Sequence, residues 1–180
     1  HAERIGFRLC DTLIYWKGPT EAFNLQKLPQ GYWSAPIENR HKESIGDLTR
    51  QRFSEYQTHY HADKRLDREK IAEAYVQWAT SCESGVVIEH EQCEFPKVHR
   101  KVVAFGTFTP CSLVLAGVDK EHEGKGFYTH LVKACMDWGH KNGFPEIEIS
   151  TQVTNTAVQK VWASLGLRPY MSVYTFHLWP

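Results

Sequence analysis

Residues 113–131 constrain the possible folds of this chain more than any other stretch. An apolar run over 113–118 ends at a charged turn that contains Gly124 and Gly126, and the apolar spacing of a helix begins directly after it. This order predicts a strand, a glycine loop and a helix. Such a loop points several backbone N–H groups, together with the positive end of the helix dipole, at the space in front of it. The stretch therefore predicts an anion site for a phosphate or pyrophosphate.

Two interpretations of this loop are open. Gly124 and Gly126 would serve a tight turn equally well, because glycine pairs occur in turns about as often as at ligands. The strand before the loop, the helix after it and the charges of Lys120 and Lys125 favour the ligand.

The size and charge of the chain limit the functions that it can have. At 180 residues it fits one domain over 1–180 with a sizeable core. Lys and Arg total 21, as do Asp and Glu, so the formal net charge is zero and no overall field attracts nucleic acid or an acidic membrane surface. No apolar stretch approaches the ~20 residues of a membrane span and no leader is present, so we expect a cytoplasmic protein with small-molecule partners. The chain starts at His1 instead of Met, which suggests a truncated N-terminal part.

The cysteines predict free thiols in a reducing compartment, because they are odd in number and form no Cys-x-x-Cys pair. We expect no metal site, since the best set of candidate ligands straddles a predicted strand and fits no familiar zinc-finger spacing. The five cysteines are Cys10, Cys82, Cys93, Cys111 and Cys135, and the candidate ligand set is Cys82, His90, Cys93 and His99.

The remaining pattern predicts a mixed α/β fold, in which a central, mostly antiparallel sheet is flanked by helices. Asp47, Asp67 and Asn155 are the expected N-caps of three helices, and Asn142 with Gly143 should end a fourth. The expected order is a strand over 5–16, a long irregular connection over 17–42, helices over 47–57 and 67–85, strands over 85–89, 101–109 and 112–118, a helix over 127–142, a strand over 147–153, a helix over 155–166 and a β-rich tail over 167–179. The three central strands should form an antiparallel meander, with the charged residues 91–100 joining the first two.

Two segments together resemble the acyl-CoA-binding signature and second motif of the GNAT superfamily of N-acetyltransferases. The first is Val-Asp-Lys-Glu-His-Glu-Gly-Lys-Gly over 118–126, and the second is Asn-Thr-Ala-Val-Gln-Lys-Val-Trp-Ala-Ser-Leu-Gly-Leu over 155–167. Their order and spacing agree with the superfamily. The resemblance implies a GNAT-like fold and an acyl-CoA-dependent N-acyltransferase with acetyl-CoA as co-substrate.

Two shorter patches resemble the TDP-fucosamine N-acetyltransferase branch, whose members acetylate nucleotide-linked amino sugars. They are Thr-His-Tyr-His-Ala-Asp-Lys-Arg over 58–65 and Gly-Phe-Arg-Leu-Cys-Asp-Thr-Leu over 6–13. Members of the branch usually carry a further segment before the second patch. The implied acceptor is the amino group of a nucleotide-linked deoxyamino sugar. Another small amine, a peptide amine, or a non-catalytic acyl-CoA-binding module are the alternatives.

The resemblance also implies which residues contact the cofactor. Backbone groups of Ala116, Gly117 and Val118 would pair with the pantetheine arm, and amides of the loop would receive the pyrophosphate. The loop residues are Glu123, Gly124, Lys125, Gly126, Phe127 and Tyr128. The superfamily loop usually opens with Arg or Gln and closes with Gly or Ala, whereas this chain has Glu123 and Tyr128. We expect the Glu123 side chain to point to solvent.

Two further cofactor contacts come from the second motif. Asn155 would contact the cofactor besides capping its helix. Trp162 stands where the superfamily commonly has a tyrosine that protonates the leaving thiolate, and an indole cannot do this. Trp162 is therefore expected to pack beside the thioester. The candidate replacements for the acid are Tyr128, Tyr170 and Tyr174, and Tyr174 is taken as catalytic.

The acceptor amine must lose a proton before it attacks the thioester, and a backbone N–H of 116–118 is the natural oxyanion donor. His59 and His61 are the candidate bases, because histidine titrates near neutral pH. Either could instead cap a helix or bond a nearby loop. Arg65 is expected to bind an acceptor diphosphate, with an exposed salt bridge as the alternative. The β-rich tail has exposed edges that make a homodimer credible.

Overall fold

The computed structural model describes residues 2–25, 27–54, 56–94, 97–109 and 111–178. Within these ranges, seven strands form two antiparallel sheets. The first sheet has the order β2-β3-β4-β5, with β2 Tyr32–Pro36, β3 Ser84–Glu94, β4 Lys97–Thr109 and β5 Ser112–Val118. The predicted meander of the three central strands is therefore confirmed, and the mixed fold with antiparallel sheets and flanking helices is confirmed with it.

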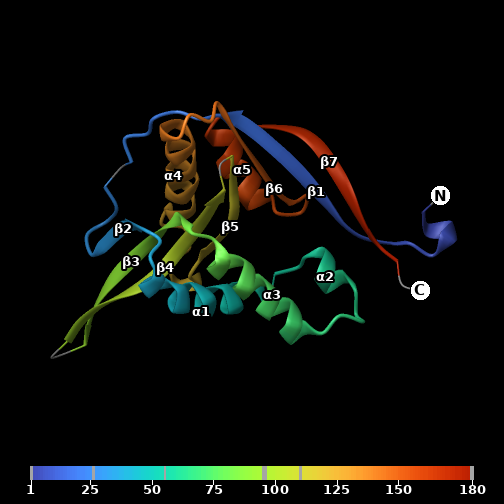
Figure 1. Ribbon diagram of the computed structural model, residues 1–180, viewed down its shortest axis with the longest axis horizontal. Coiled ribbons are helices and arrows are strands. Elements are labelled where there is room, and N and C mark those ends of the chain that lie inside the picture. The colour runs from blue at the N-terminus through green and yellow to red at the C-terminus, as the bar shows by residue number, and fades with distance from the viewer. Residues whose placement is uncertain (1, 26, 55, 95–96, 110, 179–180) are drawn as a thin grey trace.

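Helices cover both faces of the first sheet (Figure 1). The helices α1 (Lys42–Phe53) and α3 (Arg68–Ser81) pack on one face, and α4 (Phe127–Lys141) packs on the other. Neighbouring residues of β3 show the two faces: Val87 contacts the α1 and α3 side, whereas Ile88 contacts the α4 side. This follows from the alternation of side chains along a strand.

The second sheet joins the two ends of the chain. Its order is β6-β1-β7, with β1 Arg8–Pro19, β6 Glu146–Gln152 and β7 Arg168–His177. The helix α5 (Thr156–Ser164) packs beside it, and the indole of Trp162 meets that of Trp16 with ring centres 6.0 Å apart. The short helix α2 (His59–Ala62) lies near the last residues of β7 (Figure 1).

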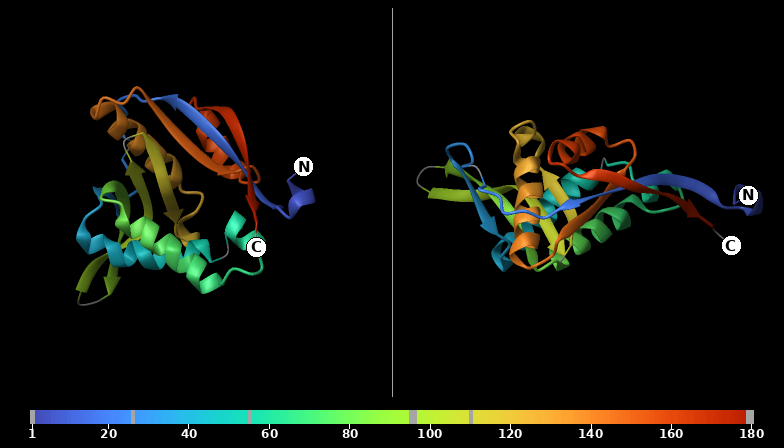
Figure 2. Two further views of the ribbon diagram at one scale, coloured as in Figure 1. Left: turned by 45° about the vertical axis from the view of Figure 1, so that its right-hand side comes forward. Right: turned by 90° about the horizontal axis from the view of Figure 1, so that it is seen from above.

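The two sheets touch where β5 and β6 begin and then diverge, as the turned views show (Figure 2). The amide of Glu148 donates to the carbonyl of Cys111 at 2.7 Å. Neither ladder pairs β5 with β6 beyond this point in the described part of the chain. The divergence leaves a wedge between the ends of the two strands.

Three expected segments need correction. The connection over 17–42 is not irregular throughout, because β1 extends to Pro19, β2 forms within it, and a 3-10 turn at Asn39–His41 leads into α1. The helix therefore starts at Lys42, and Asp47 lies inside it, paired with Arg50 at 3.5 Å. Asp47 does not act as the N-cap, since the capping box between Glu38 and His41 begins the turn earlier.

Charged residues 91–100 do not form a loop in the described positions. β3 and β4 continue to Glu94 and Lys97, with Glu91 opposite Arg100. Opposite charges on facing strand residues favour pairing, which local composition does not reveal. Residues 95 and 96, part of the same expectation, lie outside the described residues.

The local caps expected at the start of α3 and at the end of α4 are confirmed. The Asp67 carboxylate accepts from the amides of Glu69 and Lys70 at 2.8 and 3.3 Å and begins α3. Gly143, with φ of 78°, follows the end of α4.

Across the ranges given above, no helix has the length and apolar content needed to cross a bilayer.

Candidate active site

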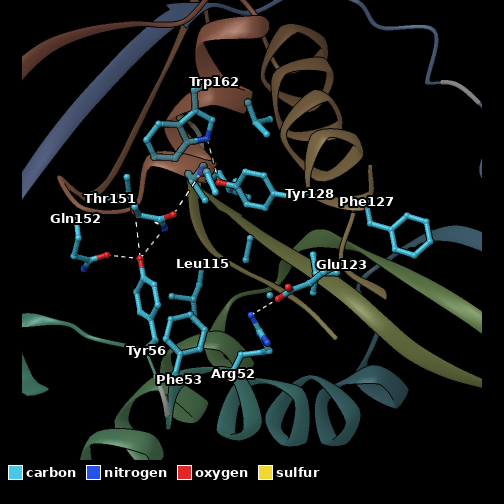
Figure 3. A pocket seen from close by; sticks show the side chains of 18 of the residues that line it. Arg52, Phe53, Tyr56, Leu115, Glu123, Phe127, Tyr128, Thr151, Gln152 and Trp162 are labelled. Carbon is cyan, nitrogen blue, oxygen red and sulfur yellow. Dashed lines mark hydrogen bonds and ion pairs between the residues drawn. The ribbon is translucent and has the colours of Figure 1, made fainter. Parts of the chain in front are cut away.

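A cavity of about 740 Å³ occupies the wedge between β5 and β6. Five parts of the chain line it: Leu13 of β1, residues 113–118 of β5, the glycine loop with the first turn of α4, the end of β6 with α5, and side chains from the α1–α3 region (Figure 3). The last group consists of Arg52, Phe53, Tyr56, His59, Tyr75 and Trp78.

The strand β5 presents one backbone edge to this cavity, because only its other edge pairs with β4. Ala116, Gly117 and Val118, expected to contact the pantetheine arm, all line the cavity. Packing explains the glycine among them: a Cβ at Gly117 would come within 2.8 Å of the buried Phe105 ring. An edge with free N–H and C=O groups can bind an extended amide-bearing chain as a further strand would.

The loop before α4 is shaped by two glycines. Gly124 and Gly126 have φ of 74° and 79°, and a Cβ at either would meet nothing within 4 Å. Gly126 is the N-cap of α4 and offers no side chain to its first amides. The first bond within the helix runs from the His130 amide to the Gly126 carbonyl at 3.1 Å, so amides 127–129 point ahead of the helix without a helical partner. Open space in front of uncapped amides fits a diphosphate.

Two charged side chains of the loop have partners on other elements. The Glu123 side chain is 53 % exposed, as expected, and its carboxylate also accepts from Arg52 Nη2 of α1 at 2.5 Å across the cavity mouth (Figure 3). The Lys125 ammonium donates to the Tyr32 hydroxyl at 3.1 Å, on β2 and away from the cavity. Nothing in the sequence pointed to Arg52, because its partner lies 71 positions further along the chain.

Asn155 is confirmed as the N-cap of α5, since its Oδ1 accepts from the Val158 amide at 3.4 Å. Its Nδ2 also donates to the Tyr56 hydroxyl at 3.0 Å and to Thr151 Oγ1 at 3.1 Å. The Tyr56 hydroxyl in turn donates to the Gln152 side chain. This network ties the segment after α1 to the end of β6 (Figure 3), and Tyr56 was not anticipated from the sequence.

Trp162 both packs in the core and lines the cavity. It is 2 % exposed, and its Nε1 donates to the Tyr128 hydroxyl at 3.1 Å (Figure 3). Burial raises the pKa of Tyr128 above its ordinary value, although the bond from Trp162 opposes part of that rise. Tyr128 therefore keeps its proton at neutral pH, and its oxygen is held at the cavity wall.

The ring of Phe127 is buried against β3 and β4, so only its backbone serves the loop.

Of the two predicted bases, only His59 lines the cavity. Its Nδ1 lies 3.1 Å from Nε2 of His177. Burial is the main cause that lowers the pKa of His59, the nearby His177 adds to the effect, and Asp11 opposes it. His61 instead bonds Thr58 Oγ1 through Nδ1 at 2.9 Å. It caps the start of its own helix, which was the alternative to a role as base.

Arg65 and Tyr174 lie away from the cavity lining. Arg65 forms two bonds with the Asp63 carboxylate, Nε to Oδ1 at 2.9 Å and Nη2 to Oδ2 at 2.8 Å. Tyr174 lies on β7, opposite Thr12 of β1, and is 65 % exposed. The Tyr170 hydroxyl donates to Glu148. These placements give no geometric support to a diphosphate contact by Arg65 or to a catalytic Tyr174.

Comparisons with known proteins agree with this architecture. The Acetyltransferase (GNAT) family matches residues 43–167. The spore coat polysaccharide biosynthesis protein SpsD of Bacillus subtilis strain 168 is 23 % identical over 159 residues, which cover 86 % of this chain and 53 % of SpsD. The chain thus spans about half the length of this curated relative.

Solved structures show the same fold at low identity. A GCN5-related N-acetyltransferase from Sphaerobacter thermophilus has a TM-score of 0.61 at 13 % identity, covering 98 % of this chain and 53 % of the other. A GCN5-related glucosamine N-acetyltransferase region of a fungal multi-domain GH3 beta-N-acetylglucosaminidase has a TM-score of 0.63 at 13 % identity, covering 98 % and 22 %. The family match over most of the chain, the two sheets and the glycine loop lead to one conclusion: this chain belongs to the acetyltransferase (GNAT) family.

Proposed function

We propose that this chain transfers an acetyl group from acetyl-CoA to a primary amine, by direct attack of the amine on the thioester. The observation that carries the proposal is a single cavity in which the free edge of β5, the uncapped start of α4 and His59 meet. Each would serve one part of the reaction: the edge the pantetheine arm, the amides the diphosphate, and the imidazole the acceptor amine.

The donor side would use main-chain groups. The diphosphate would sit on the amides that follow Gly124 and Gly126, where the helix dipole and open space favour an anion. A backbone N–H of residues 116–118 would donate to the oxyanion that forms on the thioester carbonyl. Asn155 supports this wall of the cavity through its bonds to Tyr56 and Thr151.

Tyr128 would replace the missing general acid. Its hydroxyl accepts the indole N–H of Trp162, and its own proton is free of that bond and can be donated to the departing thiolate. The raised pKa of Tyr128 keeps the proton on the oxygen until sulfur charge develops. The sequence had placed this role on Tyr174, which lies outside the cavity lining.

For the acceptor we propose an amino sugar linked to a nucleotide. The names of two similar proteins, a polysaccharide biosynthesis protein and a glucosamine N-acetyltransferase region, support a sugar. The rings of Tyr56, Tyr75 and Trp78 line the α1–α3 side of the cavity, and flat aromatic faces suit the apolar faces of a deoxy sugar. Arg52 is a cation on the same lining that can approach a diphosphate.

The test is thiol release from acetyl-CoA in the presence of separate acceptors: a TDP-linked amino sugar, glucosamine, a polyamine and a short peptide. Release with the TDP-linked amino sugar, and an acetylated product by mass spectrometry, supports the proposal in full. Release only with the other amines removes the nucleotide sugar and keeps the transferase. Acetyl-CoA binding by calorimetry without turnover of any acceptor supports a non-catalytic module instead.

A further inference from the structure

We propose that Asp63, His177 and His59 form a proton relay that takes the proton from the acceptor amine. The relay rests on the proposed transfer reaction and assigns its base. The three residues come from two distant parts of the chain, since His59 and Asp63 lie at the start and just after the end of α2, whereas His177 ends β7. The short distance between α2 and the end of β7 makes the contact possible (Figure 2).

The distances define a continuous line of hydrogen bonds. His59 Nδ1 lies 3.1 Å from His177 Nε2, and His177 Nδ1 lies 3.2 Å from Asp63 Oδ2. Asp63 is fully buried, the His177 side chain is 16 % exposed, and His59 lines the cavity. The line therefore runs from a buried carboxylate to the cavity wall.

The inner end of the line is held rigidly. Both Asp63 oxygens accept from Arg65, and the Arg65 amide adds a third bond to Oδ1 at 3.1 Å. A carboxylate fixed in this way keeps one oxygen directed at His177. This gives Arg65 a positioning role in place of the acceptor contact expected from the sequence.

The relay assigns a position to each proton along the line. A carboxylate oxygen only accepts, so His177 carries its proton on Nδ1. In the proposed relay His177 accepts at Nε2, and the donor there is the Nδ1–H of His59. Nε2 of His59 consequently keeps its lone pair, which is the form that a general base needs.

Other charged groups around His59 agree with a neutral ring at neutral pH. Burial and His177 lower its pKa, while Asp11 of β1 raises it. The Tyr60 ring lies 3.8 Å from its ring centre, and the Asp63–Arg65 ion pair lies behind His177. His59 therefore enters the reaction unprotonated.

The step balances as follows. The ammonium of the acceptor gives one proton to His59 Nε2, the Nδ1 proton of His59 passes to His177 Nε2, and the positive charge comes to rest beside Asp63. The amine then forms the C–N bond and the C–S bond breaks. Tyr128 gives its proton to the CoA sulfur, and the second amine proton replaces it on Tyr128. The relay returns its proton to solvent through His59.

The proton positions can be measured without turnover. In the full chain with ¹⁵N-labelled histidine, His59 should be the tautomer with a proton on Nδ1, and His177→Phe should remove that preference. His140→Phe is the matched control, because His140 is exposed on α4. A proton on Nε2 of His59 in the unchanged chain would overturn the relay.

Kinetics provide the second test. His59→Gln should lower kcat about 100-fold, the lower end of general-base effects. His177→Gln can accept the His59 N–H but not hold a proton, so kcat should fall about tenfold while KM for acetyl-CoA stays unchanged. In a profile of kcat against pH, the low-pH limb of His177→Gln should move to higher pH, because loss of the neighbouring imidazole raises the pKa of His59.

The outcomes separate the two proposals. A rate and pH profile of His177→Gln equal to those of the unchanged chain would remove the relay and leave the transferase. No transfer to any amine by the unchanged chain would remove the proposed function, and the tautomer measurement then decides the relay by itself.

Discussion

Arg52 and Glu123 show how one ion pair can adapt an unusual residue to its place. A carboxylate at the first position of an anion-binding loop repels phosphate unless a cation holds it. Arg52 supplies that cation from α1, at 2.5 Å. The side chains are partly exposed, so the value of the pair lies in orienting Glu123 more than in stability.

Arg52→Ala should therefore weaken acetyl-CoA binding about tenfold, which corresponds to ~1.4 kcal/mol, because Glu123 is left free to face the diphosphate. Adding Glu123→Gln should restore most of the affinity. Titration calorimetry measures both. Arg50→Ala is the control, since Arg50 lies on the same helix as Arg52 but pairs with Asp47 of α1 and Glu73 of α3. Unchanged affinity of Arg52→Ala would contradict this role.

Tyr128→Phe should lower kcat about 100-fold without a large change in KM, because general acid catalysis acts only in the transition state. Tyr170→Phe should keep the rate, since Tyr170 bonds Glu148 outside the cavity lining. Burial raises the pKa of Tyr128, so the proton is present below that raised pKa and the rate should not fall between about pH 8 and 10, the ordinary tyrosine range. Rates are measured by thiol release across this range.

The sequence identified the residues whose roles are local. Gly124, Gly126 and Asn155 could be assigned because turn and cap chemistry depends on a few neighbouring positions. The side chains of Tyr174, His61 and Arg65 could not, because their directions follow from strand register, a capping box and an ion pair with a buried carboxylate. His177 was invisible for the same reason: its partners are 114 and 118 positions away.

At the scale of elements, α4 begins and ends with glycine in the same conformation. Gly126 and Gly143 have φ of 79° and 78°, and neither is crowded by neighbouring atoms. Alanine at either should destabilise the fold by about 1 kcal/mol through left-handed strain. Of the two, only Gly126 lines the cavity. Alanine at Gly143 therefore reports backbone strain alone, whereas alanine at Gly126 reports strain together with any effect on cofactor binding.

We therefore predict that Gly126→Ala and Gly143→Ala lower the free energy of unfolding by similar amounts, measured with urea. Gly126→Ala alone should weaken acetyl-CoA binding, because it alters the direction of the first amides of α4. Equal affinity of the two variants in calorimetry would show that the loop does not carry the diphosphate.

Elements with a strong local signal could be predicted, and those formed by pairing could not. The strand, glycine loop and helix over 113–131 follow from apolar spacing and turn residues. The strand β2 has no such signal, since only its ladder with β3 defines it. The wedge between β5 and β6 depends on how two sheets diverge, which no local pattern encodes.

At the scale of the whole molecule, β7 forms an edge of the second sheet and leaves apolar and aromatic side chains exposed. They are Tyr170, Met171, Val173 and Tyr174. We predict that two copies associate through this edge. Val173→Lys should shift the population to monomers in light scattering after size-exclusion chromatography, without changing acetyl-CoA binding. A monomeric unchanged chain at all concentrations would contradict the association.

The position of β1 between β6 and β7 has a consequence for biosynthesis. The first strand pairs with residues 146–152 and 168–177, which are synthesised long after it. Until then β1 has no sheet to join, so the cavity wall that carries Leu13 and Gln152 closes only after these later residues have been synthesised. A nascent chain would form its first sheet with α1, α3 and α4 early, and would complete the cavity only once β6 and β7 have been made.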